Sequence, residues 1–255
     1  MKLASGYRAL RLLRQGEVTS VYDAWSEKRG CRCVVKVLRP GRADRADARA
    51  LAAEGRLLLS LTHPHIVRAY ELVGRPRLTL VLETLPGETL SRLLERRRRL
   101  SAPDLARLGL QLAAALGYLH RAGALHLDVK PSNVVCHAGL AKLIDLGIAR
   151  PPGRSSRGVG TDDYLAPEQA RGSAISPATD VFGLGGMLFQ SATGHPPFRS
   201  RRGHWAQLEG RAVPISSLRS LPAELSRAID ACLEPDPDAR PTLDELARRL
   251  CACLV

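Results

Sequence analysis

The sequence predicts an α+β protein with two lobes: a small antiparallel β-sheet lobe that carries one helix, and a larger, mainly α-helical lobe. Short β-prone stretches separated by turn residues fill the first third of the chain. From residue 89 onward, apolar residues recur at helical spacing instead. The length of 255 residues is enough for two lobes with a buried core. Because the chain has no Gly/Ser-rich linker, we expect a short connection between the lobes.

In the first lobe we expect several strands and one helix. The strands are expected at residues 7–13, 18–25, 31–38, 67–73 and 78–83. A helix is expected over residues 43–61, and it ends there because Pro64 cannot continue a helix. Pro86 and Gly87 follow the last strand as a natural flexible joint.

In the second lobe we expect helices and one short strand pair. The helices are expected at residues 89–97, 101–121, 177–192, 222–233 and 242–253, and the strands at residues 134–136 and 141–144. The helix over residues 101–121 is the most apolar, so it should form the core of this lobe. Ser101 is its expected N-cap, with Asp104 three residues further on as in a capping box.

The charge of the chain is strongly basic, with a formal net charge of +13. Such a balance raises the question of nucleic acid. Arginine is spread over most segments, however, with one real cluster at residues 96–99, and aromatic residues for base stacking make up only 4% of the chain. We therefore expect a solvated basic surface that favours acidic protein partners, and no nucleic-acid partner.

Neither a membrane span nor a metal-binding cysteine cluster is indicated. No apolar run reaches the roughly 18 residues that a bilayer requires, and the first residues lack the apolar core of a signal peptide. We therefore expect a soluble, cytoplasmic chain. The six cysteines include no C-x-x-C pair, so small buried thiols are expected rather than a zinc site.

The strongest chemical signal is the segment HLDVKPSN at residues 126–133, followed by DLG at residues 145–147. Transfer of a γ-phosphoryl group needs a carboxylate to orient the attacking hydroxyl, a cation beside the migrating charge, and oxygen ligands for magnesium. Asp128, Lys130, Asn133 and Asp145 supply these groups. The segment therefore predicts a phosphoryl-transfer centre.

The order and spacing of these residues resemble the catalytic loop H-R-D-x-K-x-x-N and the D-F-G motif of protein kinases. The resemblance covers about residues 7–250 and is strongest to the catalytic domain of bacterial eukaryotic-type (Hanks-type) serine/threonine kinases, for which YLAPEQARG at residues 164–172 is typical. It implies a bilobal kinase fold in a single domain over residues 1–255, with the N-lobe at about 1–82, the hinge at about 83–87 and the C-lobe at about 88–255.

The resemblance also implies catalytic roles. Asp128 would orient a serine or threonine hydroxyl, and Lys130 and Lys36 would neutralise phosphate charge. Glu54, in the first-lobe helix that matches the kinase αC helix, would form an ion pair with Lys36. Thr161 would bond to Asp128 and Lys130. For the metal, Asn133 and Asp145 would hold Mg²⁺, with Mn²⁺ as an alternative.

The nucleotide-binding residues implied by the resemblance are Gly16, Val21, Val34, Lys36, Leu82, Glu83, Leu85 and Val135. Leu82 matches the gatekeeper, and the backbones of Glu83 and Leu85 match the hinge that bonds adenine. Val34 shares a strand face with Lys36, so it should line the adenine site. Two structural contacts are also implied: Asp180 supports the backbone of the catalytic loop, and Arg240 pairs with Glu168.

Two of the departures from the family pattern bear on activity. Residues 14–21 read RQGEVTSV, so Gly16 is the only loop glycine that remains and the phosphate clamp should be weaker or more mobile. Leu127 replaces the arginine of H-R-D, which normally pairs with a phosphorylated activation loop. We therefore expect activity that does not depend on activation-loop phosphorylation, although Ser155, Ser156 and Thr161 remain candidate autophosphorylation sites.

The leading interpretation is an ATP-dependent serine/threonine protein kinase that also phosphorylates itself. The alternative is a pseudokinase, a weak ATP-binding scaffold that acts through protein contacts, because the glycine-rich loop is degraded. A third interpretation, a basic module for nucleic acid or acidic partners on a kinase fold, rests on the charge alone. The sequence names no substrate and leaves homodimer formation open.

Overall fold

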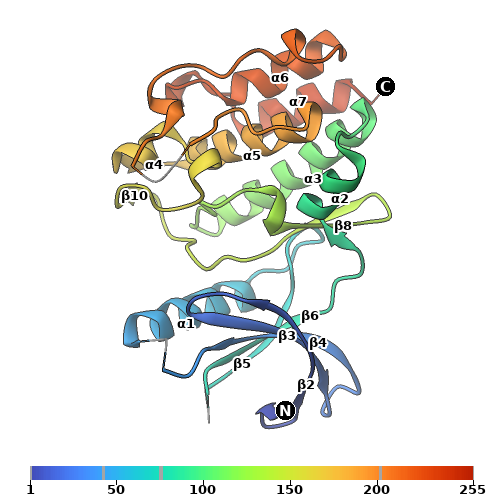
Figure 1. Cartoon of the computed structure of the whole chain (residues 1–255), viewed down its shortest axis with the longest axis vertical. Helices are drawn as coiled ribbons and strands as arrows, with labels where there is room; N and C mark the ends of the chain where they lie inside the picture. The colour runs from blue at the N-terminus through green and yellow to red at the C-terminus, as the bar shows by residue number, and fades with distance from the viewer. Residues whose placement is uncertain (1, 42–43, 75–76, 201–202, 255) are drawn as a thin grey trace. The chain divides into compact units, whose positions relative to one another are not determined.

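The computed structural model describes residues 2–41, 44–74, 77–200 and 203–254. The chain divides into two compact units, unit 1 over Met1–Pro86 and unit 2 over Gly87–Val255 (Figure 1). Each unit has a hydrophobic core of its own.

Unit 1 contains an antiparallel sheet of six strands. They are β1 (Lys2–Ala4), β2 (Tyr7–Gln15), β3 (Thr19–Ser26), β4 (Cys31–Leu38), β5 (Ala69–Val73) and β6 (Thr79–Glu83), in the spatial order β1-β2-β3-β4-β6-β5. The five expected strands are confirmed, with ends that move by one or two residues. The sequence did not predict β1, because three residues are too few to show an alternating pattern.

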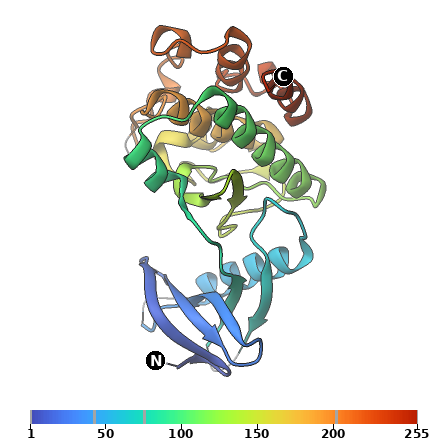
Figure 2. The ribbon, with the colours of Figure 1, turned by 90° about the vertical axis from the view of Figure 1, so that its right-hand side faces the viewer.

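The helix of unit 1, α1 (Arg45–Ser60), begins at the N-cap Asp44, whose side chain accepts hydrogen bonds from the backbone amides of Ala46 and Asp47. The expected start at Ala43 lies outside the described residues. α1 packs beside β5 (Figure 2), and a Cβ on Gly55 would lie 2.8 Å from the side chain of Leu72. Glycine at this position therefore allows the helix to approach the sheet closely.

The two faces of β4 separate the core of unit 1 from its candidate nucleotide-binding residues. Cys33, Val35 and Val37 are buried and form part of the core, whereas Val34 and Lys36 are only partly buried. This alternation is the division of faces that the sequence predicted.

Unit 2 is mainly helical. Its helices are α2 (Leu90–Arg97), α3 (Ala102–Arg121), α4 (Pro167–Arg171), α5 (Pro177–Thr193), α6 (Ala223–Cys232) and α7 (Leu243–Ala252). Its strands are β7 (Glu88–Thr89), β8 (Val134–His137) and β9 (Leu140–Leu143), which form one sheet, and β10 (Gly153–Arg154) and β11 (Ala174–Ile175), which pair with each other. Short 3₁₀ helices cover Pro131–Asn133, Asp162–Tyr164, Ala206–Leu208, Ile215–Ser217 and Pro237–Ala239.

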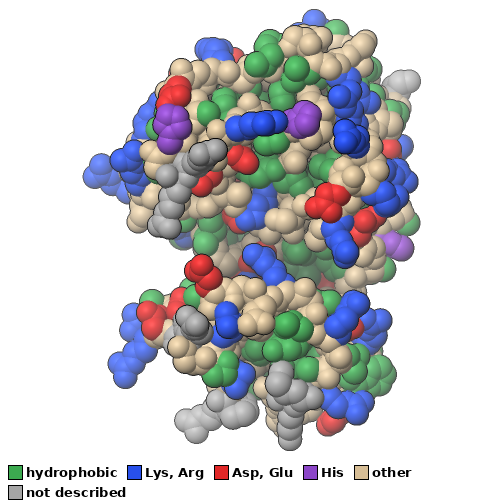
Figure 3. Space-filling model, in the orientation of Figure 1, with side chains coloured by type: hydrophobic (Ala, Val, Ile, Leu, Met, Phe, Trp, Pro, Cys, Tyr) green, Lys and Arg blue, Asp and Glu red, His purple; other side chains and the backbone are tan. Residues whose placement is uncertain are grey.

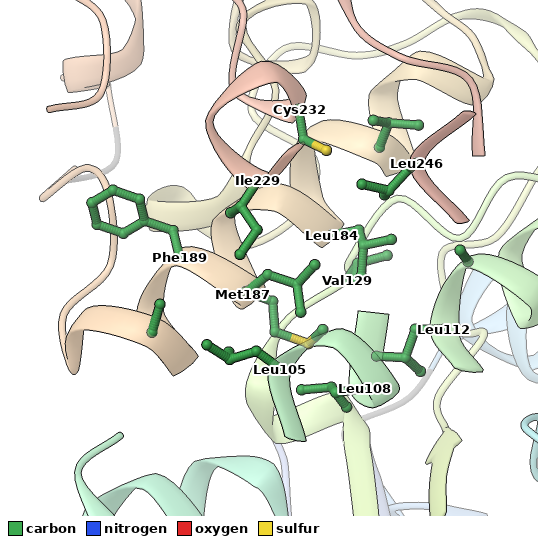
Figure 4. Close-up of a cluster of buried hydrophobic side chains, with 14 of the residues drawn as sticks. Leu105, Leu108, Leu112, Val129, Leu184, Met187, Phe189, Ile229, Cys232 and Leu246 are labelled. Carbon is green, nitrogen blue, oxygen red and sulfur yellow. The ribbon is translucent and has the colours of Figure 1, made fainter. Parts of the chain in front are cut away.

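The core of unit 2 forms around α3 and α5, as the sequence predicted for the helix over residues 101–121. Figure 4 shows leucines of α3 facing side chains of α5, α6 and α7. The labelled members are Leu105, Leu108, Leu112, Val129, Leu184, Met187, Phe189, Ile229, Cys232 and Leu246. The expected helices and the β8–β9 pair are confirmed. The short elements α4, β7, β10 and β11 were not predicted.

The cysteines only partly follow the sequence-based expectation. All six are free thiols, and burial raises the pKa of Cys33 to about 11 and that of Cys232 to about 12. Cys251, however, is exposed, so the expectation of buried thiols is wrong for that residue. No group of three or more His, Cys, Asp or Glu side chains among the described residues is arranged to hold a metal ion.

Two further features concern the distribution of basic side chains on the surface and the length and apolarity of the helices. On the face shown in Figure 3, Lys and Arg side chains are distributed over each unit instead of gathering in one patch. Within the described ranges, no helix combines the length and apolarity that a bilayer crossing needs.

Candidate active site

The candidate catalytic loop is held by a buried carboxylate on α5. Asp180 Oδ1 accepts a hydrogen bond from the backbone amide of Leu127 at 2.7 Å, and Oδ2 accepts one from the amide of His126 at 2.8 Å. These bonds hold Leu127 in a left-handed backbone conformation, with φ of 66°. The support of this loop by Asp180, which the sequence predicted, is therefore confirmed.

His120 also contributes to this anchor, and the sequence analysis missed it. Its Nε2 lies 2.7 Å from Asp180 Oδ2, and its side chain is only 10% exposed. A histidine near the end of a long helix has no distinctive pattern in the sequence. Its role becomes visible only when a carboxylate 60 residues later is brought beside it.

Three predicted catalytic side chains form one hydrogen-bonded network in unit 2. Thr161 Oγ1 donates to Asp128 Oδ1 at 2.6 Å, and Lys130 Nζ donates to Thr161 Oγ1 at 2.6 Å. Lys130 Nζ also lies 2.7 Å from Asp128 Oδ2. The Asp128 and Lys130 side chains remain 17% and 18% exposed, so both still reach solvent. The predicted contacts of Thr161 with Asp128 and Lys130 are confirmed.

Asn133 joins the same network through its amide nitrogen. Nδ2 donates to Asp128 Oδ2 at 3.0 Å and to the Asp128 carbonyl at 2.9 Å. Because the nitrogen makes both of these bonds, the amide oxygen is the atom that Asn133 presents for another partner. The Asn133 carbonyl also accepts a hydrogen bond from the amide of Ile144 at 2.8 Å, which brings the chain at Asp145 beside Asn133.

These two residues fit a divalent cation by their chemistry. Asn133 and Asp145 both offer oxygen, the donor that Mg²⁺ and Mn²⁺ prefer. Asp145 has a φ of 65°, a conformation that is rare for residues other than glycine. Two protein ligands are usual where the remaining ligands of the ion are phosphate oxygens and water.

In unit 1, Lys36 and Glu54 form the predicted ion pair. Lys36 Nζ lies 3.0 Å and 2.9 Å from the two carboxylate oxygens of Glu54. The side chains are 13% and 3% exposed, so the pair is shielded from solvent. The pair therefore fixes the direction of the Lys36 head group.

Four of the candidate nucleotide-binding residues share one face of the unit 1 sheet. Val21 lies opposite Lys36 in the β3–β4 pair, and Val34 lies opposite Leu82 in the β4–β6 pair. Because directly opposed residues point to the same face, the four side chains form one partly buried patch.

The remaining nucleotide candidates lie elsewhere. Glu83 ends β6, and its carboxylate accepts a hydrogen bond from the amide of Arg68 at 2.9 Å. Leu85 lies in the irregular segment after β6. Val135 belongs to unit 2, where it pairs with Thr89 in the β7–β8 ladder.

The turn that replaces the glycine-rich loop is closed and fastened to the end of β4. The Gly16 amide donates to the Thr19 carbonyl at 2.9 Å. Arg39 donates its guanidinium to the Gly16 carbonyl at 2.7 Å, and its backbone amide donates to the Val18 carbonyl at 2.8 Å. The sequence analysis did not identify Arg39, because an arginine beyond the end of a strand usually belongs to the surface.

Leu127, which replaces the arginine of H-R-D, packs in a small apolar cluster with Leu125 and Ile175. Close by, β10 pairs with β11, and the Ser155 amide donates to the Ser173 carbonyl at 3.1 Å. Arg150 donates to the Ser155 hydroxyl at 3.0 Å. Ser155 is only 8% exposed. Unmodified side chains thus order this part of the activation segment, the stretch between the DLG motif at residues 145–147 and α4.

Gln169 ties the end of the activation segment to the catalytic loop. Its Nε2 donates to the carbonyls of Leu127 and Val159 at 3.0 Å each, and its Oε1 accepts from the amide of Ala166 at 3.0 Å. Gly160 lies in the same place with φ of 132°, and a Cβ there would lie 3.0 Å from the Leu127 carbonyl. The sequence analysis quoted Gln169 only as part of a motif and gave it no role.

Arg240 and Glu168 form the predicted buried ion pair. Arg240 reaches both carboxylate oxygens of Glu168, at 2.8 Å and 2.9 Å, and the two side chains are 0% and 6% exposed. Arg240 also bonds to the carbonyls of Ala178 and Glu234 and lies over the ring of Phe182. The pair therefore connects α4, α5 and the segment before α7.

Comparisons with known proteins agree with this geometry. A family model described as "Protein kinase domain" matches residues 7–250. The chain is 36% identical over 252 residues to the serine/threonine-protein kinase PkaA of Streptomyces coelicolor. This match covers 93% of this chain and 46% of that protein. The chain is 35% identical over 209 residues to the serine/threonine-protein kinase PknA of Mycobacterium tuberculosis, covering 77% of this chain and 48% of that protein. The chain thus spans less than half the length of these two relatives.

Proposed function

The chain belongs to the protein kinase domain family, as a domain of the bacterial eukaryotic-type serine/threonine class, and from this we propose that it transfers the γ-phosphoryl group of ATP to serine and threonine hydroxyls of proteins, its own included. The observation that carries the proposal is the network of Asp128, Lys130 and Thr161, which has the groups that phosphoryl transfer needs in fixed positions.

In this proposal, Asp128 accepts a hydrogen bond from the substrate hydroxyl and orients its oxygen for attack. Thr161 holds Oδ1 of Asp128, so the carboxylate cannot rotate freely. Lys130, which contacts both Asp128 and Thr161, stabilises the negative charge that develops on the transferring phosphoryl group.

The resemblance to protein kinases supports nucleotide-binding roles for residues of each unit. Lys36, fixed by Glu54, would bind phosphate oxygens, and Gly16 lies in the turn that would cover them. Val21, Val34, Leu82 and Val135 would contact adenine, and the backbones of Glu83 and Leu85 would bond its edge. We assign the N-lobe to about residues 1–82, the hinge to 83–87 and the C-lobe to 88–255.

For the metal we propose Mg²⁺, with Mn²⁺ as an alternative, held by Asn133 and Asp145. A divalent ion would supply neutralisation of phosphate charge. The oxygen donors of these two residues support this choice, because softer transition metals favour nitrogen and sulfur ligands. The amide nitrogen of Asn133 meanwhile keeps Asp128 in place.

The proposal extends to partners and location. The expected substrates are proteins with accessible serine or threonine, including acidic ones, and the expected location is the cytoplasm. Homodimer formation remains part of the proposal, and the mass of the chain in solution, measured by light scattering, tests it. The pseudokinase alternative gains no support, because Lys36, Asp128, Asn133 and Asp145 are all present. Lys36, Asp128 and Asn133 also form the contacts given above.

The test is transfer from γ-labelled ATP with Mg²⁺ or Mn²⁺ to the chain itself and to generic basic and acidic proteins. We expect label on serine or threonine, and a loss of about 10²-fold or more in the Asp128→Asn and Asp145→Asn variants. The altered turn at Gly16 predicts an ATP affinity weaker than low micromolar in the same preparation. A folded wild-type protein that transfers no label to any acceptor at high ATP would overturn the proposal in favour of the pseudokinase.

A further inference from the structure

A groove of about 410 Å³ lies in unit 2, and none of the candidate catalytic residues lines it. Its walls are α2, the first turns of α3 and the β8–β9 hairpin, of which α2 and β8 lie side by side in Figure 1. We call it the α2–hairpin groove. The arginine cluster at residues 96–99, to which the proposed kinase reaction gives no role, begins at its rim.

The walls of the α2–hairpin groove are held in place by hydrogen bonds. Gln111 of α3 donates to the Gly139 carbonyl at 2.9 Å and accepts from the Ala141 amide at 2.7 Å, so it clamps both sides of the hairpin turn. Arg96 of α2 forms an ion pair with Glu88 of β7. A preformed site binds a ligand with a smaller loss of conformational entropy than a mobile one.

The floor of the groove is apolar. Leu100 and Leu108 are buried beneath it, and Leu93 is partly buried. At the rim, Leu140 is 59% exposed, which is the largest exposed fraction among the large apolar side chains described. An exposed leucine beside a buried leucine floor offers a contact for another apolar side chain.

The groove is lined by more basic than acidic side chains. Arg96 is paired with Glu88, and Arg107 is paired with Asp104. Arg97 also lines the groove; within the described part of the chain it forms no ion pair at contact distance, and its charge acts on Asp104 from further away. In Figure 3, basic, acidic and histidine side chains crowd the edge of unit 2 where Figure 1 places α2 and the hairpin. Three arginines against two carboxylates leave the rim with a net positive charge.

We propose that the α2–hairpin groove docks an acidic, leucine-containing segment of a protein substrate. Carboxylates of the segment pair with Arg97 and its neighbours, and a leucine packs on Leu140. Nucleic acid fits less well, because no Phe, Tyr or Trp side chain lines the groove for base stacking, and the leucine floor and Leu140 offer no partner for a phosphate backbone. The identification of this segment as part of a substrate rests on the proposed kinase function. The binding of the segment to the groove does not depend on that function.

Binding is tested first, without ATP. The probe is a short fluorescein-labelled peptide in which glutamates flank two leucines, and fluorescence anisotropy reports its affinity. We expect Arg97→Glu to weaken binding at least about fivefold, because an attractive contact becomes repulsive. Leu140→Asp should weaken it about tenfold, because an apolar contact is lost. Arg248→Glu on α7 is the matched control, since it makes the same charge change at an exposed arginine outside the groove.

The outcomes separate the proposal from its rivals. Weaker binding in Arg97→Glu and Leu140→Asp, with Arg248→Glu unchanged, supports docking in the groove. Equal weakening in all three variants means that only net charge attracts the peptide, and the proposal is overturned. It is overturned equally by a duplex oligonucleotide that displaces the peptide and binds more tightly than the peptide does.

A second measurement tests recruitment of a substrate. A protein acceptor is assayed with and without the acidic segment fused to it. In Arg97→Glu we expect a higher KM for the fused acceptor at unchanged kcat, and no change for the acceptor that lacks the segment. If the wild-type chain binds the peptide but transfers no phosphate, the kinase proposal fails and the docking site stands.

Discussion

Leu127 and Asp145 share an unusual property: both adopt positive φ angles without being glycine. Such conformations cost on the order of 1–3 kcal/mol each and persist only where surrounding contacts enforce them. For Leu127 the contacts are visible, since Asp180 holds its amide and Gln169 its carbonyl. The candidate catalytic loop is thus held in a strained conformation by residues on two other segments.

A first prediction concerns phosphorylation of the activation segment. The double variant Ser155→Ala, Ser156→Ala should keep its phosphotransfer activity to within about threefold, because β10–β11 pairing and the Leu127 cluster order the segment without phosphate. Steady-state transfer to a generic acceptor measures this. Ser155→Glu is the informative companion: it places a charge at a site that is 8% exposed, so it should lower activity rather than mimic activation. Abolished activity in the double alanine variant would contradict the prediction.

Among elements, α3 has the clearest link between a sequence signal and stability. Ser101 accepts a hydrogen bond from the Asp104 amide and donates one to the Asp104 carboxylate. The Ser101 hydroxyl, followed by Arg107, lowers the pKa of Asp104 below its ordinary value of 3.8. Because this pKa is lower in the folded state, its stabilising contribution is present above the ordinary value and is lost as the pH falls through the folded-state pKa.

The corresponding prediction concerns Ser101→Ala. The variant should lose about 1 kcal/mol of unfolding free energy at neutral pH, the usual effect of removing an N-cap. Part of that difference should disappear at a pH well below 3.8, where Asp104 is protonated in both proteins. Urea unfolding at several pH values measures this. A difference from wild type that stays constant down to low pH would show that Asp104 takes no part.

Sequence reasoning worked best where a long pattern or a fixed spacing was available. The helix over residues 101–121 and the Lys36–Glu54 pair were predicted because periodicity and motif offsets are local properties of the sequence. β10 and β11 have two residues each and show no periodicity at all. His120 and Gln169 depend on partners 60 and 42 residues away, and nothing in their neighbourhood indicates those contacts.

For the whole molecule, the separate cores of the two units have a measurable consequence. Arg240→Ala leaves Glu168 buried without its cation, which typically costs about 3–5 kcal/mol. We expect this loss to appear in unit 2 alone. The chain has two tryptophans, Trp25 in unit 1 and Trp205 in unit 2, so each unit has its own fluorescent reporter.

The measurement is denaturant unfolding of Arg240→Ala in the Trp25→Phe and Trp205→Phe backgrounds. The transition reported by Trp205 should move to lower denaturant, while that reported by Trp25 stays in place. The double variant Arg240→Met, Glu168→Gln serves as the control, because it removes both charges and should recover part of the loss. An equal shift of both transitions would mean that the two units unfold as one cooperative body.

The anchoring of the catalytic loop by Asp180 also sets an order of events during synthesis. Asp180 lies 53 residues after Leu127, so a growing chain exposes the loop before it possesses the carboxylate that shapes it. At typical translation rates of about 5–20 residues per second, this interval lasts about 3–10 seconds. During that time the left-handed turn at Leu127 has no counterpart to enforce it. Under the proposed function, a nascent polypeptide is therefore unable to phosphorylate neighbouring proteins on the ribosome until α5 has emerged and docked.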